Sequence, residues 1–314
     1  MRARAALSIL CATTLAAGLA VAAHQQDQGR LNVQVNLVNL FATVRDKHHA
    51  IVTSLTKDDF TVHEDGQPQT ISFFSADSDL PVTLGMLLDT SGSEMDMLMA
   101  EQDAASRFLG RVMRKGDLAM VMTFDTDVDL LADFTDDRSV LDSAIRRAKI
   151  NAVSVGGVFT PGPIPQSGSK GTNFYDAVYL ACHQKLADEA GRKALVVMTD
   201  AEDNGSKVSL QDAIEAAQRT DTVVHILLIA EDGGDRYVAS KLTEETGGRM
   251  IVVRSEKNIE QAFDQLSEEL RHQYSLGYTS TNRAMDGTYR KIKVEAKNKD
   301  YSVLTRRGYY APKK

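Results

Sequence analysis

Residues 82–93 read VTLGMLLDTSGS, an apolar run of strand length followed at once by a short polar loop. The apolar part, Val82–Leu88, is typical of a strand that is covered on both faces in a parallel sheet. The polar part, Asp89–Ser93, is rich in turn-forming residues. The loop is therefore expected at the carboxyl edge of a sheet, where open α/β folds bind their ligands.

Strand-like and helix-like segments alternate after this run. Strands are predicted at 118–123, 128–131, 195–198, 223–229 and 250–253, and helices at 95–114, 138–149, 173–189, 210–219 and 236–245. In a last helix, apolar residues from Ile259 to Leu270 recur at the three-and-four spacing of one buried face. This order of βαβ units predicts an α/β fold with a Rossmann-like, doubly wound, mostly parallel sheet over residues 80–273.

The segments on either side of this region have a β pattern instead. In an N-terminal β unit, residues 31–76, apolar and polar residues alternate from Leu31, and an Asp65-Gly66 turn predicts a hairpin between strands 60–64 and 69–74. Within residues 274–312, further strands are predicted at 274–278, 290–296 and 301–305. We expect these C-terminal strands to pack with residues 31–76 in a small, sandwich-like β domain.

The N-terminal residues predict export. Arg2 and Arg4 precede an apolar stretch that ends in small residues, so residues 1–23 are interpreted as a secretory signal peptide, with a retained membrane anchor as the alternative. Cleavage would change the net charge from -7 to -7 - 2 = -9 and leave Cys182 as the only cysteine. We expect a periplasmic or secreted protein without an intrachain disulfide, which contacts a membrane only if this segment is uncleaved.

Charge and motifs argue against nucleic acids and nucleotides as ligands. Lys and Arg number 36 against 43 Asp and Glu, without a long basic run. Residues 168–172 (GSKGT) do not match a phosphate-binding loop, because glycine does not precede the lysine and does separate it from the threonine. Asp125, Asp127 and Asp129 resemble the start of an EF-hand loop, but Leu130 stands where that loop needs glycine, so a solvated hairpin is expected there.

Three loops carry oxygen-bearing side chains at equivalent positions. The first is Asp89–Ser93, the second is Gly171–Asn173 before a predicted helix, and the third is Thr199–Asp203 after a predicted strand. Loops of this kind can converge at one edge of a parallel sheet. Carboxylate and hydroxyl oxygens are the ligands that hard divalent cations such as Mg²⁺ prefer. The sequence therefore predicts a cation site at this edge.

The order of the three motifs resembles the metal-ion-dependent adhesion site of von Willebrand factor A (VWFA) domains. The motifs are DTSGS at 89–93, GTNFYDA at 171–177 and VVMTDAEDNGS at 196–206, and the resemblance covers roughly residues 80–273. It implies that Ser91, Ser93 and Thr172 give hydroxyl oxygens to the metal, and that Asp89 and Asp200 act largely through bound water and hydrogen bonds. Mg²⁺ is the expected ion, with Mn²⁺ or Ca²⁺ as alternatives.

The flanking strands extend the likeness to most of the chain without residues 1–23. Residues 31–46, 58–75, 274–280 and 306–312 resemble those of exported VWFA-related proteins of Acidobacteria. Two features depart from the family pattern. Ala201 stands where the family usually has glycine, and the loop at 154–170 is unusually long, which could shape the choice of partner.

The resemblance implies a non-enzymatic adhesion or protein-interaction module. An open coordination position on the cation would accept a carboxylate oxygen from an Asp or Glu of a partner protein. One alternative is a metal-assisted hydrolase, for which Glu94 and Glu202 are the neighbouring acids that could act as the base, although both are expected to be exposed loop charges. Another is a structural VWFA protein that binds no metal.

Overall fold

A parallel sheet forms the centre of the α/β region. The computed structural model describes residues 37–76, 80–94, 97–150, 171–229 and 234–313. Among these residues, six strands pair in the order β10-β9-β8-β5-β6-β7, and all are parallel except the edge strand β7. They are β5 (Val82–Asp89), β6 (Leu118–Phe124), β7 (Val128–Thr135), β8 (Arg192–Thr199), β9 (Thr222–Ile229) and β10 (Met250–Val253). The strand order reverses at β5, which places its loop at a topological switch point.

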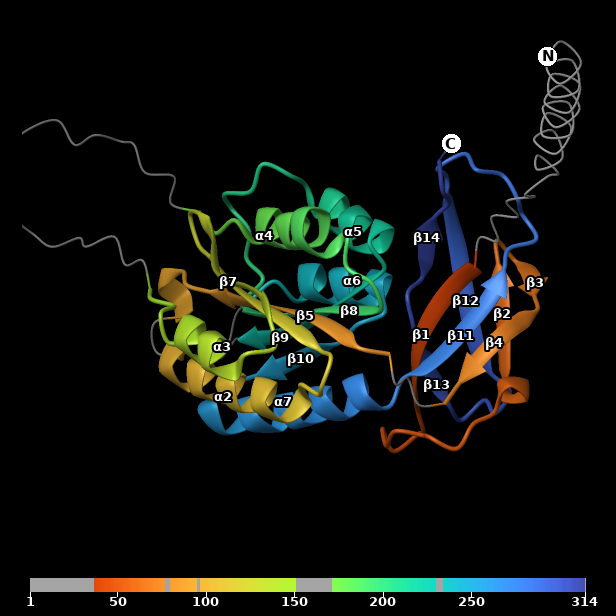
Figure 1. The fold of residues 1–314 in the computed structure, drawn as a ribbon, viewed down its shortest axis with the longest axis horizontal. Helices are drawn as coiled ribbons and strands as arrows, with labels where there is room; N and C mark the ends of the chain where they lie inside the picture. Colours follow the sequence, from red (N-terminus) through yellow and green to blue (C-terminus); the bar gives the residue numbers. More distant parts are fainter. Residues whose placement is uncertain (1–36, 77–79, 95–96, 151–170, 230–233, 314) are drawn as a thin grey trace, which may run out of the picture. The chain divides into compact units, whose positions relative to one another are not determined.

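Helices cover both faces of this sheet (Figure 1). One face carries α2 (Leu98–Val112), α3 (Arg138–Ile145) and α7 (Glu256–Arg271), and the other carries α4 (Phe174–Leu180), α5 (Leu210–Arg219) and α6 (Arg236–Thr246). The helix α4 continues as a π-helical turn over Ala181–Leu186. Every residue of β5 is buried, as expected for a strand between two helix layers. The predicted α/β class with a doubly wound, mostly parallel sheet is confirmed.

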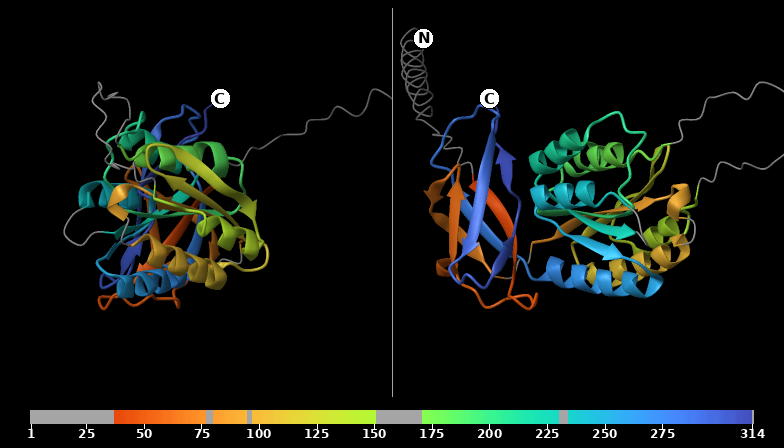
Figure 2. Two further views of the ribbon diagram at one scale, coloured as in Figure 1. Left: turned by 90° about the vertical axis from the view of Figure 1, so that its left-hand side faces the viewer. Right: turned by 180° about the vertical axis from the view of Figure 1, so that it is seen from behind.

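Strands that flank this region in the sequence pair with one another (Figure 2). In the described chain they form two four-stranded sheets, β13-β1-β11-β4 and β14-β12-β2-β3. The strands are β1 (Leu37–Arg45), β2 (Phe60–Glu64), β3 (Gln67–Gln69), β4 (Ile71–Ser75), β11 (Tyr274–Thr279), β12 (Tyr289–Ala296), β13 (Ser302–Leu304) and β14 (Gly308–Tyr310). One apolar cluster draws residues from both sheets, among them Leu40, Val62, Leu276 and Val294.

The hairpin predicted between 60–64 and 69–74 is wrong in its second strand. Of the predicted second strand, only Gln69 at the end of β3 pairs with β2, and the chain then crosses to the other sheet, where β4 pairs with β11. The crossing occurs at Thr70, between the two short strands. Alternation of apolar and polar residues has the same period in either sheet, so it could not show the change of partner.

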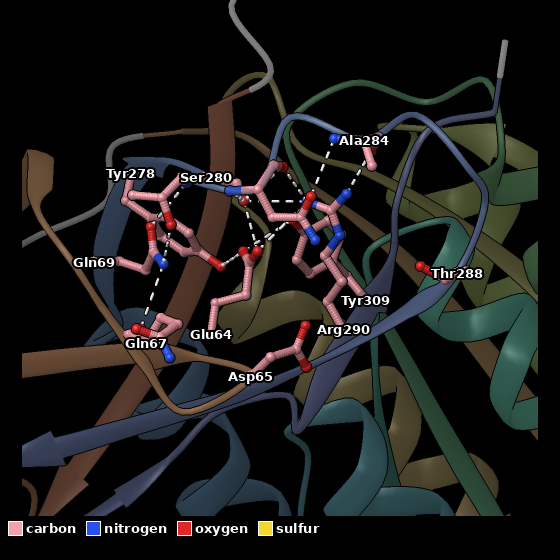
Figure 3. A network of polar contacts seen from close by, with 12 residues as sticks. Glu64, Asp65, Gln67, Gln69, Tyr278, Ser280, Ala284, Thr288, Arg290 and Tyr309 are labelled. Atoms are coloured by element: carbon pink, nitrogen blue, oxygen red, sulfur yellow. Dashed lines mark hydrogen bonds and ion pairs between the residues drawn. The ribbon is translucent and has the colours of Figure 1, made fainter.

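A buried ion pair lies between the two antiparallel sheets (Figure 3). Glu64 on β2 and Arg290 on β12 are each 2% exposed, and Arg290 Nη1 lies 3.4 Å from Glu64 Oε1. Hydroxyl groups donate to the Glu64 carboxylate from Tyr278 (2.7 Å), Ser280 (2.5 Å) and Tyr309 (3.0 Å). Arg290 also donates to the carbonyl oxygens of Asn282 and Ala284. The pair therefore fixes the loop after β11 against both sheets.

Two predicted segments lie outside the described residues, namely the signal peptide at 1–23 and the long loop at 154–170. Within the described ranges, no helix is both long and apolar enough to cross a membrane.

Candidate metal centre

The first loop is held by the carboxylate at the end of β5. Asp89 Oδ1 accepts the N–H of Ser91 (2.9 Å), and Asp89 Oδ2 accepts the hydroxyl of Thr199 (2.6 Å) at the end of the neighbouring strand β8. The hydroxyl oxygens of Ser91 and Ser93 lie 2.9 Å apart. The two serine oxygens expected to face a cation are therefore side by side, with the buried Asp89 behind them.

Asp200 joins this group from the third loop. Its Oδ1 accepts the N–H of Glu202 at 3.0 Å, and its backbone oxygen accepts the N–H of Asp235 at 2.8 Å. Asp235 caps the first turn of α6 by accepting from Val238 N at 2.9 Å. The start of α6 thus positions the third loop, and a carboxylate oxygen of Asp200 lies within 4.8 Å of one from Asp89.

Thr172 is positioned by contacts with the third loop. Its N–H donates to Asn204 Oδ1 at 2.8 Å, and its backbone oxygen accepts from the N–H groups of Asn204 and Gly205, both at 3.3 Å. Gly171 and Gly205 approach so closely that a Cβ on Gly171 would lie 2.8 Å from Gly205 Cα. Two loops far apart in sequence therefore meet at this edge because both have glycine at the contact.

Asp125 is a positioning residue that sequence reasoning missed. The predicted hairpin between β6 and β7 forms, but Asp125 at its start is 7% exposed, so the expectation of a solvated side chain is wrong there. Its Oδ2 accepts the Thr90 hydroxyl (2.9 Å), and its backbone oxygen accepts the N–H of Asn173 (2.7 Å). Asp125 thus joins the first loop to the second. No local pattern predicts this role of Asp125, because its partners Thr90 and Asn173 lie far from it in the sequence.

Glu94 also differs from expectation. It was expected as an exposed loop charge, but in the short helix Gly92–Glu94 it is only 1% exposed. The neighbouring Glu101 on α2 is fully buried. Within the described residues, Glu94 Oε2 and both carboxyl oxygens of Glu101 have no hydrogen-bond partner, so no described donor neutralises these atoms. Glu202, by contrast, is exposed as expected.

Burial makes these acids difficult to ionise without a cation. Desolvation raises the pKa of Asp89 from 3.8 to about 6, in spite of hydrogen bonds from Ser91 and Thr199. Burial also raises the pKa of Glu94 and of Glu101, and the negative charge of Asp89 raises both further. A divalent cation would supply the positive charge that this cluster lacks. The acids and the nearby hydroxyls therefore fit such an ion.

We expect the cation-free protein to lose stability as pH rises. The folded-state pKa of Asp89 is raised to about 6, so the stability contributed by its neutral form is complete below its unfolded pKa of 3.8 and is lost as pH rises through 6. Glu94 and Glu101, with raised pKa values, act in the same direction. Mg²⁺ should offset this loss because it binds the ionised carboxylates.

Melting temperatures in EDTA and in Mg²⁺ between pH 5 and 8 check this expectation. The gap between the two curves should widen with pH. Groups remote from the cation, such as buried His225 with its pKa lowered to about 4, affect both curves alike. A gap that stays constant over this range would contradict the assignment of these carboxyls to a cation site.

The doubly wound sheet, with acidic and hydroxyl side chains gathered at its carboxyl edge, defines an α/β domain with a candidate cation site. Residues 84–202, which include the first two loops and most of the third, match the family model of the von Willebrand factor type A domain. The chain thus contains a VWFA-type domain over these residues. The search of the curated proteins found no match.

Two solved structures are similar in fold. A von Willebrand factor type A protein from Catenulispora acidiphila is 11% identical, with 81% of this chain and 73% of that chain covered and a TM-score of 0.50. Proximal thread matrix protein 1 from the mussel byssus is also 11% identical, with 66% and 51% covered and a TM-score of 0.51. At such identities the likeness concerns the fold alone.

Proposed function

We propose that this chain is an exported, non-enzymatic interaction module that holds an acidic residue of a partner protein through a divalent cation. Five residues would hold the cation directly or through water: Asp89, Ser91, Ser93, Thr172 and Asp200. The main support is the convergence of loops, in which carboxylate oxygens of Asp89 and Asp200 lie within 4.8 Å of each other beside the paired hydroxyls of Ser91 and Ser93. Export is proposed from the signal-like residues 1–23.

The chemistry of the site supports binding in preference to turnover. Mg²⁺ is the proposed ion, and Mn²⁺ and Ca²⁺ also accept oxygen ligands of these types. When bound, the cation supplies a Lewis-acidic position for an incoming oxygen. A hydrolase would need a base near the cation that can reach solvent. Glu94 is buried, and the exposed Glu202 is not part of the group formed by Asp89, Glu94 and Asp200. VWFA domains are generally interaction modules, which favours the same conclusion.

Water-proton relaxation with Mn²⁺ tests whether the cation keeps a position for a carboxylate. Mn²⁺ bound to the wild-type protein should enhance relaxation, because water exchanges at an open coordination position. Acetate should lower the enhancement by displacing that water, whereas chloride at equal ionic strength should not. Thr172→Ala should weaken Mn²⁺ binding, and the exposed Glu202→Gln serves as the matched control. An enhancement that acetate leaves unchanged would argue against recognition of a carboxylate.

A further inference from the structure

The carboxyl of Glu94 reaches the site although it is outside the five residues assigned above. One ligand oxygen each from Asp89, Glu94 and Asp200 lie within 4.8 Å of one another. A Ca²⁺ ion, with metal–oxygen distances of about 2.3–2.6 Å, can contact oxygens separated by that much, and Mg²⁺, at about 2.0–2.1 Å, would draw them to within about 4.2 Å of one another. Glu94 is 1% exposed, whereas Ser93 is exposed to solvent. The Glu94 carboxyl is therefore enclosed by protein, whereas the Ser93 side chain is accessible to solvent.

We propose that Glu94 is a direct ligand of the cation, bound from the buried side of the site. The proposal rests on the proposed function, because it requires a cation at this edge of the sheet. An inner carboxylate would anchor the ion in the domain and leave the side of Ser91 and Ser93 to the partner. Glu94 would then set the affinity for the cation, while the exposed loop residues meet the partner.

The surroundings of Glu94 support a ligand role. The charged groups that act most strongly on it are all acidic, namely Glu101, Asp89 and Asp200. Its Oε2 has no N–H or O–H donor in the part of the chain that the structure describes. A buried carboxylate without a donor or a counter-charge is strongly unfavourable, so either protons or a cation must neutralise the cluster.

The competing explanation is structural. Glu94 and Glu101 would share a proton and form a neutral pair that packs under the loop without touching the ion. The two explanations differ in what an amide at either position does. Glutamine keeps the shape of glutamate but cannot carry its negative charge, so it should remove a cation ligand and yet preserve a neutral hydrogen-bonded pair.

Calorimetry distinguishes the ligand role from the structural explanation. Mg²⁺ and Ca²⁺ are titrated into metal-stripped wild type, Glu94→Gln and Glu101→Gln. Glu101→Gln is the matched control, because Glu101 is equally buried but is not part of the group with Asp89 and Asp200. We expect Glu94→Gln to lower the affinity on the order of tenfold or more, and Glu101→Gln to have a smaller effect. Glu94→Met, which also fills the buried space, should lose affinity as well.

Melting temperatures with and without cation also distinguish a ligand role of Glu94 from a purely structural one. Without cation, Glu94→Gln should be at least as stable as wild type because a buried acid is removed, and its stabilisation by added cation should shrink. Wild-type affinity in either Glu94 variant, or an equal loss in Glu101→Gln, would overturn the ligand role and leave the proposed function intact. Absence of cation binding in the wild type would instead overturn the proposed function itself.

Discussion

Replacing Arg290 by methionine is expected to lower the free energy of unfolding by about 3–5 kcal/mol. Methionine keeps much of the apolar stem but removes the guanidinium that pairs with Glu64. The carboxylate of Glu64 would remain buried at 2% exposure without its counter-charge. The carbonyl oxygens of Asn282 and Ala284 would lose their donor at the same time.

Urea unfolding followed by circular dichroism measures this change. Arg107→Met is the control, because Arg107 pairs with Glu260 on an exposed surface, where such pairs contribute at most about 1 kcal/mol. The double variant Glu64→Leu/Arg290→Met should recover part of the loss, since no charge is then left buried. If Arg290→Met proved no more destabilising than Arg107→Met, the buried pair would not hold the antiparallel sheets as described.

Replacing Gly171 by alanine is expected to weaken cation binding by about 10–100-fold. The added Cβ would lie 2.8 Å from Gly205 Cα and 2.9 Å from Asn204 O, which are backbone atoms that cannot simply rotate away. The second and third loops would have to separate, and the hydrogen bond from Thr172 N to Asn204 would be lost or lengthened. Thr172 would then move away from the other proposed ligands.

Gly92→Ala is the matched control for this substitution. Gly92 lies in the first loop, and no described atom comes within 4 Å of a Cβ built on it. Calorimetry with Mg²⁺ should therefore give near wild-type affinity for Gly92→Ala and a large loss for Gly171→Ala. Equal affinities in the two variants would show that contact between the second and third loops does not position Thr172.

The parts of the fold that could be predicted are those with a local signal. The apolar run of β5 predicts a strand that is buried on both faces, and the polar residues at its end predict a loop at the sheet edge. The contacts between loops have no such signal. Gly171 and Gly205 matter because each packs against the other loop, and the sequence does not reveal which segment will lie opposite.

The burial of charged residues is what could least be predicted from the sequence. Glu94 and Asp125 each lie next to a turn, where an acid is usually solvated, and only the packed structure shows that both are buried. The position of Ala201 was correctly recognised from the sequence as one where glycine is usual. Its φ of 61° lies in the left-handed region that glycine adopts freely, so the departure is accommodated with some backbone strain.

Isothermal titration of Mg²⁺ and Mn²⁺ into metal-stripped wild-type protein measures the cation site itself. We expect saturable binding of one cation per chain, lost in Asp89→Ala, which removes the acceptor for Ser91 N–H and the Thr199 hydroxyl, and also lost in Thr172→Ala. A wild-type protein that binds neither ion, or binding that survives unchanged in both variants, would contradict a cation site formed by these loops.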